Sequence, residues 1–276
     1  MNKLPLALLA ALALFAREPL ANRIAHSDPA KYRHIEAVHD GAGSMDFFPL
    51  FNYDVFNTNL QFLHRGVIRP KSGIGAHFHN HCEEMFVILD GEAQFTIDGH
   101  TSLLKAPAGA ICRAGHSHAI YNATDKPVQW MNINVSMVKG RYDAFNLGDA
   151  RVGAPLDPIP QFISMRLDRS LLRSSGAVKY RRALGPDAFD TNWSYVDHML
   201  VPGGASTPKE RFEGVEEFYY VMEGEGVAHI DAESAPIKKG DAVPVLLNES
   251  HSIENTGSSD LELMVVGIAR VKYALN

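Results

Sequence analysis

The stretch GAHFHNHCEEMFVILDG, from Gly75 to Gly91, decides how this chain is understood. It opens with three histidines that alternate with other residues, continues with two adjacent glutamates, and ends in an apolar run before Asp90-Gly91. Residues i and i+2 of a β-strand point to the same face, so the side chains of His77 and His79 project together. We therefore expect a strand that carries metal-binding side chains on one face, followed by a strand that belongs to a hydrophobic core.

Two further residues complete a set of metal-binding side chains. Glu84 follows the histidines after a short turn, so we expect it on the next strand, where its carboxylate can return beside His77 and His79. His118 is expected on a later strand of the same half. Three imidazoles and one carboxylate that converge inside a barrel form a mononuclear site for a divalent transition metal, with open positions for water or a ligand. The donor set suits iron(II), manganese, nickel, cobalt or zinc.

Most of the chain past residue 45 has the pattern of short strands, with turns recurring every eight to twelve residues. This rhythm is typical of an all-β sandwich or barrel. The dipeptides Asp90-Gly91 and Asp98-Gly99 each separate two apolar or alternating runs and predict hairpins. Strands are expected at residues 60–68, 85–89, 92–97, 118–121, 128–135, 178–182, 193–201, 217–222 and 226–230.

The second half of the chain repeats the first. EEMFVILDGEAQFTIDG at Glu83–Gly99 aligns with EEFYYVMEGEGVAHIDA at Glu216–Ala232, and SHAIYN at Ser117–Asn122 aligns with SHSIEN at Ser250–Asn255. Both matches are ungapped and share one offset, since Glu84 pairs with Glu217 and His118 with His251 at the same separation. We infer an internal duplication in which each half forms one barrel.

This duplication divides the chain into four parts. Residues 1–21 are interpreted as a signal peptide, 45–136 as the N-terminal barrel and 178–270 as the C-terminal barrel. Residues 137–177 contain the Pro-rich run GAPLDPIPQ and are interpreted as a linker, partly extended, with one short helix near its end.

The spacing of the metal-binding residues resembles the first signature of the cupin family. His77-x-His79 is followed after four residues by Glu84 and after six more by Gly91. This resemblance implies two tandem cupin barrels, that is, double-stranded β-helix or jelly-roll folds, with a metal held in the N-terminal one. It also implies a homodimer, because barrels of this type often pair.

The second signature of the family is Pro-x-Gly, a short gap and His-x-x-x-Asn. Here Pro107-Ala-Gly109 precedes His118-Ala-Ile-Tyr-Asn122, with a gap longer than the usual one. The longer gap leaves His116 as a rival for the last ligand position. The internal repeat favours His118, because His118 aligns with His251 of the second half.

The second half keeps the pattern of the barrel but not the full ligand set. Its two histidine positions hold Glu210 and Phe212, while Glu217 and His251 remain. Two ligands hold a transition metal poorly, so we expect a degenerate site there and a supporting role for this barrel. Glu210 or Glu213 would complete a weak site if the loop bends differently.

Several other residues of the first half are candidates for a part in the site. Aromatic side chains would form apolar walls and arginines would bind a carboxylate or an enolate, whereas the alternative for each is ordinary packing or an exposed charge. His81 continues the histidine alternation and is a further candidate ligand. The substrate-binding candidates are Arg65, Phe86, Arg113 and Trp130, and the catalytic candidates are Glu83, His116 and Tyr121.

A metal centre of this kind supports three classes of function. The first is an oxygenase, dioxygenase-like, that acts on a small oxygen-rich or aromatic substrate. The second is a metal-dependent isomerase, lyase or hydrolase of a sugar or sugar acid, and the third is a non-catalytic protein that binds a small molecule. The fold does not choose among them, and the intact four-ligand set favours an enzyme.

Composition bounds the compartment and the partners. The formal charge of −6 without a basic cluster argues against nucleic acid, and no apolar run reaches the roughly 20 residues of a membrane span. Lys3 followed by the apolar run Leu4–Ala16 resembles a secretory signal, with cleavage after Ala16 or Ala21. We therefore expect a periplasmic or secreted protein, or a cytoplasmic one if that segment is not a signal. Cys82 and Cys112 could pair in an exported protein, or one could be a free thiol.

Overall fold

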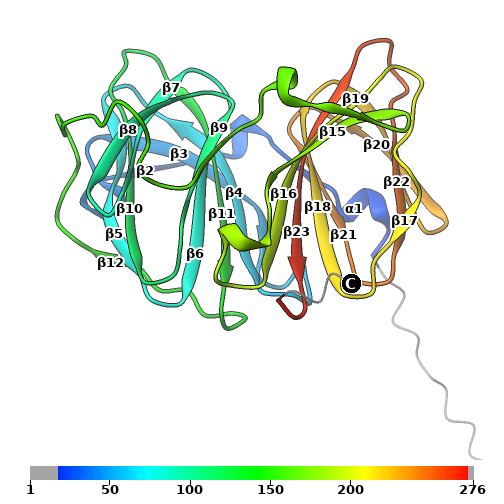
Figure 1. Ribbon diagram of the computed structural model, residues 1–276, viewed down its shortest axis with the longest axis horizontal. Helices are drawn as coiled ribbons and strands as arrows, with labels where there is room; N and C mark the ends of the chain where they lie inside the picture. The colour runs from blue at the N-terminus through cyan, green and yellow to red at the C-terminus, as the bar shows by residue number, and fades with distance from the viewer. Residues whose placement is uncertain (1–17, 273–276) are drawn as a thin grey trace, which may run out of the picture.

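The computed structural model describes residues 18–272, which form two β-barrels side by side (Figure 1). The predicted all-β fold with two tandem jelly-roll barrels is confirmed. Most of the proposed signal segment lies outside the described residues, so export stays a prediction of the sequence. The homodimer likewise stays a prediction. Within the described part of the chain, no helix has the length and apolar character needed to cross a membrane.

The first barrel is built from two facing sheets. One has five strands in the order β12-β5-β10-β7-β8, and the other has seven in the order β13-β9-β6-β11-β4-β3-β2. The strands are β2 (Arg33–Glu36), β3 (Ser44–Asn52), β4 (Leu60–Ile68), β5 (Ser72–His79), β6 (Cys82–Ile88), β7 (Glu92–Ile97), β8 (His100–Lys105), β9 (Ala108–Cys112), β10 (His116–Asn122), β11 (Val128–Ser136), β12 (Phe145–Asn146) and β13 (Ser164–Arg166).

The second barrel repeats this plan with a four-stranded sheet, β17-β22-β19-β20, that faces a seven-stranded one, β1-β21-β18-β23-β16-β15-β14. Its strands are β1 (Ala25–His26), β14 (Arg173–Ser175), β15 (Val178–Leu184), β16 (Trp193–Val201), β17 (Glu210–Arg211), β18 (Val215–Glu223), β19 (Glu225–Ile230), β20 (Glu233–Lys238), β21 (Asp241–Val245), β22 (Ser250–Glu254) and β23 (Leu261–Ala269). The helical segments are α1 (Leu20–Arg23), η1 (Pro29–Lys31), η2 (Val38–Asp40), η3 (Arg169–Leu171) and η4 (Pro186–Ala188).

The start of the described chain packs on the second barrel, not the first. Strand β1 pairs with β21, and α1, drawn in blue, lies against the right-hand barrel of Figure 1. Leu20 is only 1% exposed, and Arg23 donates two hydrogen bonds, of 2.7 and 2.8 Å, to the carboxylate of Glu249. Of the two proposed cleavage positions, the one after Ala21 would therefore remove a core residue, whereas the one after Ala16 would keep it.

One of the two predicted hairpins is confirmed and the other is wrong. Asp98-Gly99 joins the paired strands β7 and β8, and both residues have the positive φ that a tight two-residue turn requires, 48° and 83°. Asp90-Gly91 instead carries the chain from β6 in the seven-stranded sheet to β7 in the five-stranded one. The dipeptide is the same in both places. The outcome differs because β6 pairs with β9 and β11 instead of with β7.

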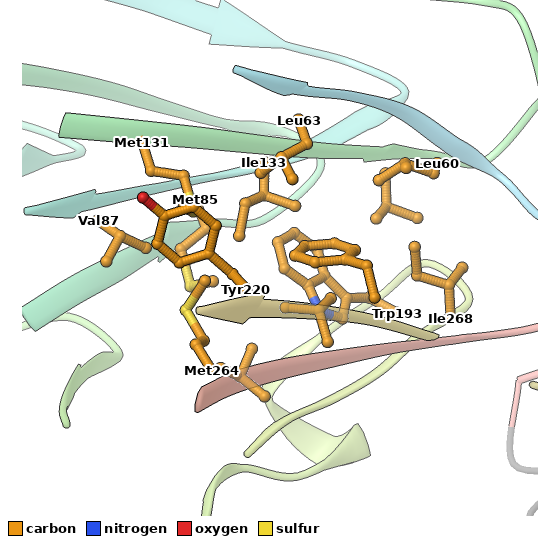
Figure 2. Packing of buried hydrophobic residues seen from close by; sticks show 14 of the residues in the cluster. Leu60, Leu63, Met85, Val87, Met131, Ile133, Trp193, Tyr220, Met264 and Ile268 are labelled. Carbon is orange, nitrogen blue, oxygen red and sulfur yellow. The ribbon is translucent and has the colours of Figure 1, made fainter. Parts of the chain in front are cut away.

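The two seven-stranded sheets pack against each other and share one hydrophobic core (Figure 2). Met85 and Val87 of β6 meet the second barrel, whose β18 offers Phe218 and Tyr220 at the equivalent positions of the repeat. Because each seven-stranded sheet is covered on both faces, most of its residues are apolar. The residues labelled in Figure 2 are Leu60, Leu63, Met85, Val87, Met131, Ile133, Trp193, Tyr220, Met264 and Ile268.

Two buried glutamates, one from each barrel, accept hydrogen bonds from the other barrel. Glu83 accepts hydrogen bonds from the backbone N–H groups of Asp190 (2.5 Å) and Thr191 (2.8 Å), and from the Thr191 hydroxyl (2.5 Å). Its equivalent, Glu216, accepts from the side chain of Asn57 (2.8 Å) and the backbone N–H of Thr58 (2.7 Å). The donors of the two links occupy equivalent positions of the repeat, as their acceptors do, so the interface has an approximate two-fold symmetry.

The Glu83 link gives a first prediction. In Glu83→Gln, an amide N–H would face the donors of Asp190 and Thr191, so the free energy of unfolding should fall by about 1.5 to 3 kcal/mol, as for hydrogen bonds to a charged group. The measurement is urea unfolding followed by circular dichroism. The control is Glu213→Gln at an exposed position, where a change within about 0.5 kcal/mol is expected. An equal loss in both variants would contradict a role for Glu83 in joining the barrels.

Candidate metal centre

The structure brings the four side chains predicted as ligands to one point inside the first barrel. His77 and His79 lie on β5, and His118 lies on β10, which pairs with β5 so that His118 is opposite His77. Glu84 reaches across the barrel from β6 in the facing sheet. One donor atom from each of the four residues lies within 4.8 Å of the others, and all four residues are buried. Such a buried group suits one divalent metal.

Hydrogen bonds to the backbone orient two of the imidazoles. The Nδ1–H of His77 can donate to the carbonyl of Gly75 (2.8 Å), and that of His79 to the carbonyl of Asp143 (2.5 Å). With the proton on Nδ1, each Nε2 presents a lone pair to the centre. The Nε2 atom of His118 lies 3.0 Å from that of His77 and 3.2 Å from that of His79. Two nitrogens bound about 2.1 Å from one ion at a right angle would be about 3.0 Å apart, so the spacing fits a shared ion.

Two asparagines hold the carboxylate of Glu84. Asn132 donates to one carboxylate oxygen and Asn134 to the other, both at 2.8 Å. Both amides come from β11, on which Asn134 is directly opposite Glu84. Neither asparagine was among the predicted site residues, although the alternation Asn-x-Asn in a predicted strand of the same barrel was a usable signal.

The electrostatics favour the ligand forms of these groups. Burial opposes ionisation of Glu84, but its interactions with His77, His79 and His118 prevail and hold the pKa of the carboxyl below its ordinary value. Burial, together with His77, lowers the pKa of His118 well below its ordinary value. An ionised carboxylate beside a neutral imidazole is the state that metal binding requires.

A cavity of about 180 Å³ adjoins the carboxylate of Glu84. Aromatic and aliphatic side chains make up most of its wall, and neither lysine nor arginine contributes to the lining within the described chain. The polar residues besides Glu84 are His39, His64, Asn132 and Tyr142, of which the sequence analysis named none. The apolar lining is Ile35, Val38, Met45, Phe47, Phe62, Ile74 and Trp130.

A short segment between β2 and β3 lies over this cavity. The ring of His39, in η2, stacks on the ligand His77 with centroids 3.9 Å apart, and its Nδ1 lies 2.7 Å from the side-chain oxygen of Asn146. Ala37, His39 and Asp40 have positive φ values of 50°, 50° and 60°. Gly75 allows the close approach, because a Cβ there would lie 2.1 Å from the carbonyl oxygen of His39. This segment is thus seated directly over the strand that carries two of the four donor groups.

The predicted arginines lie between the barrels instead of in the cavity. Arg65 is buried and donates to the hydroxyl of Tyr220 in the second barrel (2.9 Å) and to Gln129 (2.6 Å). It alternates with His64, which lines the cavity, so its side chain leaves the opposite face of β4. Arg113 forms an ion pair with Asp190 of the second barrel. Neither arginine therefore lines the cavity beside Glu84.

Two of the predicted aromatic residues lie at the site and the third does not. Trp130 lines the cavity, and Phe86 stacks on the ring of His118 with centroids 4.3 Å apart. Tyr121 is buried but lies outside the cavity lining, next to Ile120 of the barrel core.

Three polar candidates point away from the centre. Glu83 belongs to the interface described above. His81 is exposed, and the rival ligand His116 is exposed with its Nδ1 2.5 Å from the carboxylate of Asp98. The outcome for His116 leaves His118 as the fourth member of the donor group.

The two cysteines are free and buried. Burial raises the pKa of Cys82 to about 11, and burial also raises the pKa of Cys112 well above its ordinary value. Neither thiol belongs to the donor group, so the cluster consists of nitrogen and oxygen donors.

The chain belongs to the cupin family. The model of the family described as Cupin domain matches residues 64–134 and again residues 197–267, and the two matches are related by the offset of the internal repeat. This double match agrees with the internal duplication and with the two barrels of the structure, so the protein is a bicupin.

Known proteins resemble this chain in part or over most of its length. An oxalate-binding protein of Thermotoga maritima is 40% identical over 91 residues, which cover 33% of this chain and 75% of that protein. Oxalate decarboxylase of Lactobacillus farciminis, solved as a formate complex, superposes with a TM-score of 0.66 at 12% identity, over 90% of this chain and 87% of that chain. A salicylate 1,2-dioxygenase from Pseudaminobacter salicylatoxidans gives 0.59 at 15% identity, over 78% and 72%. The likeness to the two solved structures shows the fold alone.

The donor group gives a second prediction. His79→Ala removes one of the four donors, and metal content after purification should fall several-fold, because the remaining three no longer surround the ion. The measurement is elemental analysis by mass spectrometry. The matched control is His251→Ala, which changes the position equivalent to His118 in the second barrel and should leave metal content near that of the unchanged protein. Loss of metal from the His251 variant alone would place the ion in the second barrel and contradict the assignment.

Proposed function

We propose that this bicupin is a metal-dependent oxidoreductase of the dioxygenase type, acting on a small aromatic substrate that carries oxygen substituents. One observation carries the proposal: the cavity beside the donor group has a mostly apolar wall, rich in aromatic side chains, to which neither lysine nor arginine contributes among the described residues. A small dianion would find no cation there other than the metal. An aromatic ring would find dispersion and stacking partners on several sides.

The size of the cavity agrees with a single ring. A dry protein cavity of about 150 Å³ lined by apolar side chains is large enough to bind benzene. The cavity here has about 180 Å³, which leaves room for one or two substituents.

The few polar atoms on the wall would orient such a substrate. The indole Nε1–H of Trp130 and the side-chain oxygen of Asn132 are buried and have no hydrogen-bond partner. Burial lowers the pKa of His64 to about 4 and raises the pKa of Tyr142, so the imidazole stays neutral and the phenol stays protonated at neutral pH. The wall thus offers hydrogen-bonding groups to the oxygen substituents of a ring.

His77, His79, Glu84 and His118 would hold the ion. A redox-active ion in this position supplies the means to bind substrate oxygens and to activate dioxygen. Asn132 and Asn134 keep the Glu84 carboxylate in place, and His39 stacks on the ring of His77 in the wall of the cavity.

The proposal predicts oxygen consumption. Protein reconstituted with iron(II) should take up dioxygen when given hydroxylated monocyclic aromatic acids and should not do so with oxalate. The measurement is an oxygen electrode with product analysis by mass spectrometry. No uptake with any member of an aromatic panel, at full iron loading, would contradict an oxygenase.

The cavity wall gives a test of the substrate class. Ile35→Trp should fill the outer part of the cavity and raise KM for the aromatic substrate about tenfold, equivalent to about 1.4 kcal/mol. Metal content should not change, since Ile35 is not a ligand. Glu36→Trp is the matched control, because Glu36 is exposed, is not part of the lining and alternates with Ile35 on β2. Equal effects of the two changes would argue against binding in this cavity.

A second candidate function is oxalate binding without turnover, which the 40% identity with the Thermotoga maritima protein favours. Here the metal would supply the only positive charge for the ligand. Calorimetry distinguishes the two candidates: saturable oxalate binding that requires metal, with no oxygen uptake on any aromatic substrate, supports the binding protein. Weak or absent oxalate binding with aromatic turnover supports the oxygenase.

A further inference from the structure

The second barrel has its own cavity of about 260 Å³, at the place that corresponds to the first cavity. The lining has changed in chemical character, because apolar or neutral residues of the first barrel are replaced by hydroxyl-bearing and charged ones. Val178, Tyr180, Tyr195, Asp197 and Glu217 are the repeat equivalents of Met45, Phe47, Phe62, His64 and Glu84, which line the first cavity.

Hydrogen bonds within the protein occupy the carboxylate that would be a metal ligand. Glu217 accepts from the hydroxyls of Tyr195 (2.5 Å) and Tyr219 (3.1 Å), and the Nε2 of His251 lies 3.1 Å from the same carboxylate. In the first barrel, Asn134 supplies one of these bonds. Its equivalent is Gly267, and the ring of Tyr195 fills the vacated space, since a Cβ on Gly267 would lie 2.2 Å from that ring.

The positions equivalent to His77 and His79 hold Glu210 and Phe212, so the second barrel lacks these two imidazole donors as well. Glu210 lies opposite His251, as His77 lies opposite His118, but it is exposed. Phe212 packs near His251 with ring centroids 5.6 Å apart. Among residues 18–272, no second group of donors as close as the one in the first barrel is formed.

A row of side chains, polar except for Val265, crosses the seven-stranded sheet where it lines this cavity. The strand registers place Arg182, Asp197, Val265 and Tyr219 side by side on β15, β16, β23 and β18. Arg182 donates two hydrogen bonds to Asp197, of 3.0 and 3.2 Å, and its guanidinium lies 4.2 Å from the centre of the Tyr195 ring. The charges of Arg182 and Asp197 are therefore paired with each other, while both side chains still line the cavity.

Burial of these groups is costly in a barrel that serves only as support. Asp197 and Glu217 are each 5% exposed, and His251 is 1% exposed. Replacing buried ionic groups by apolar side chains of similar volume is often neutral or stabilising. Here they surround an open space instead of a packed core, which indicates a ligand.

We propose that the C-terminal barrel is a second, metal-independent small-molecule site, and that it binds a neutral polyhydroxylated ring, such as a monosaccharide or a cyclic polyol. The buried charged residues of the lining already have partners inside the protein: Arg182 pairs with Asp197, and Glu217 accepts from Tyr195 and Tyr219 beside His251. The interior therefore presents no unpartnered charge to an ionic ligand. Only the exposed Glu210 adds a charge at the cavity.

The chemistry of the lining fits hydroxyl groups and the apolar face of a ring. The hydroxyl of Tyr180 can donate and accept, whereas that of Tyr195 donates to Glu217 and can only accept from a ligand. Arg182 has N–H groups beyond the two used by Asp197, and carboxylates accept. The flat faces of Tyr180 and Phe212 offer apolar contact to ring C–H groups. The site is independent of the dioxygenase proposal, since it shares no residue with the first cavity.

Titration calorimetry on the full chain tests the proposal. The probes are D-glucose, D-galactose, D-mannose, L-arabinose and myo-inositol, with choline as a cationic and oxalate as an anionic comparison. We expect saturable binding of at least one neutral probe at millimolar or lower concentration, and equal affinity in His79→Ala, which lacks one donor of the metal centre in the first barrel.

A matched pair of variants places the ligand. Ser175 is exposed and lines the cavity, and Ser174, its neighbour on β14, is exposed and does not line it. Ser175→Trp should weaken binding at least tenfold, whereas Ser174→Trp should leave the affinity within about twofold, that is, about 0.4 kcal/mol. Tyr180→Phe, which removes one hydroxyl without changing the ring, should weaken binding about fivefold, and unchanged metal content reports that each variant is folded.

Three results would overturn the proposal. The first is no saturable heat with any neutral probe. The second is saturation by choline or oxalate in place of the neutral probes. The third is affinity that falls in His79→Ala and persists in Ser175→Trp, which would place the ligand in the first barrel.

Discussion

The alternation of side chains along β6 is the constraint on which the rest of the structure depends. Glu84 and Phe86 point into the first barrel, toward the imidazoles, while Glu83, Met85 and Val87 point out of it, toward the second barrel. A strand has only two faces, and both of these are buried. The same short strand therefore fixes a donor to the candidate ion and the surface on which the other half of the protein sits. A shift of one residue in register would exchange the two roles and destroy both.

Burial on both faces also explains how the candidate centre is kept rigid. The sheet that carries Glu84 is pressed between the barrel interior and the shared core, so the carboxylate cannot relax without disturbing one of them. Asn132 and Asn134 reach it from the neighbouring strand of that sheet, and the histidines are oriented by carbonyl groups of Gly75 and Asp143. Orientation by such outer contacts is what tunes a metal site beyond the identity of its ligands.

The sequence predicted the four donors and the duplication because both depend on regular spacing, period two along a strand and one constant offset between the halves. It could not predict what covers the cavity. His39 and Tyr142 come from segments outside the barrel strands, and their positions depend on how η2 and the linker fold back over β5. Arg65 was misplaced for a related reason: an arginine on a strand can face either a pocket or another barrel, and only the long-range packing against Tyr220 decides. The hairpin predicted at Asp90-Gly91 was wrong for the same reason, since long-range strand pairing places β6 and β7 in different sheets.

The replacement of Asn134 by Gly267 shows what covalent fusion of two equal halves makes available. In a symmetric pair of separate chains, any substitution appears on both sides of the two-fold axis, so the amide that steadies one carboxylate could not be lost from the other alone. With the halves on one chain, each position can vary independently while the glutamate links across the interface hold the two barrels together. One half is then free to retain its inherited chemistry, and its twin to acquire a new one, without either losing the scaffold that both require.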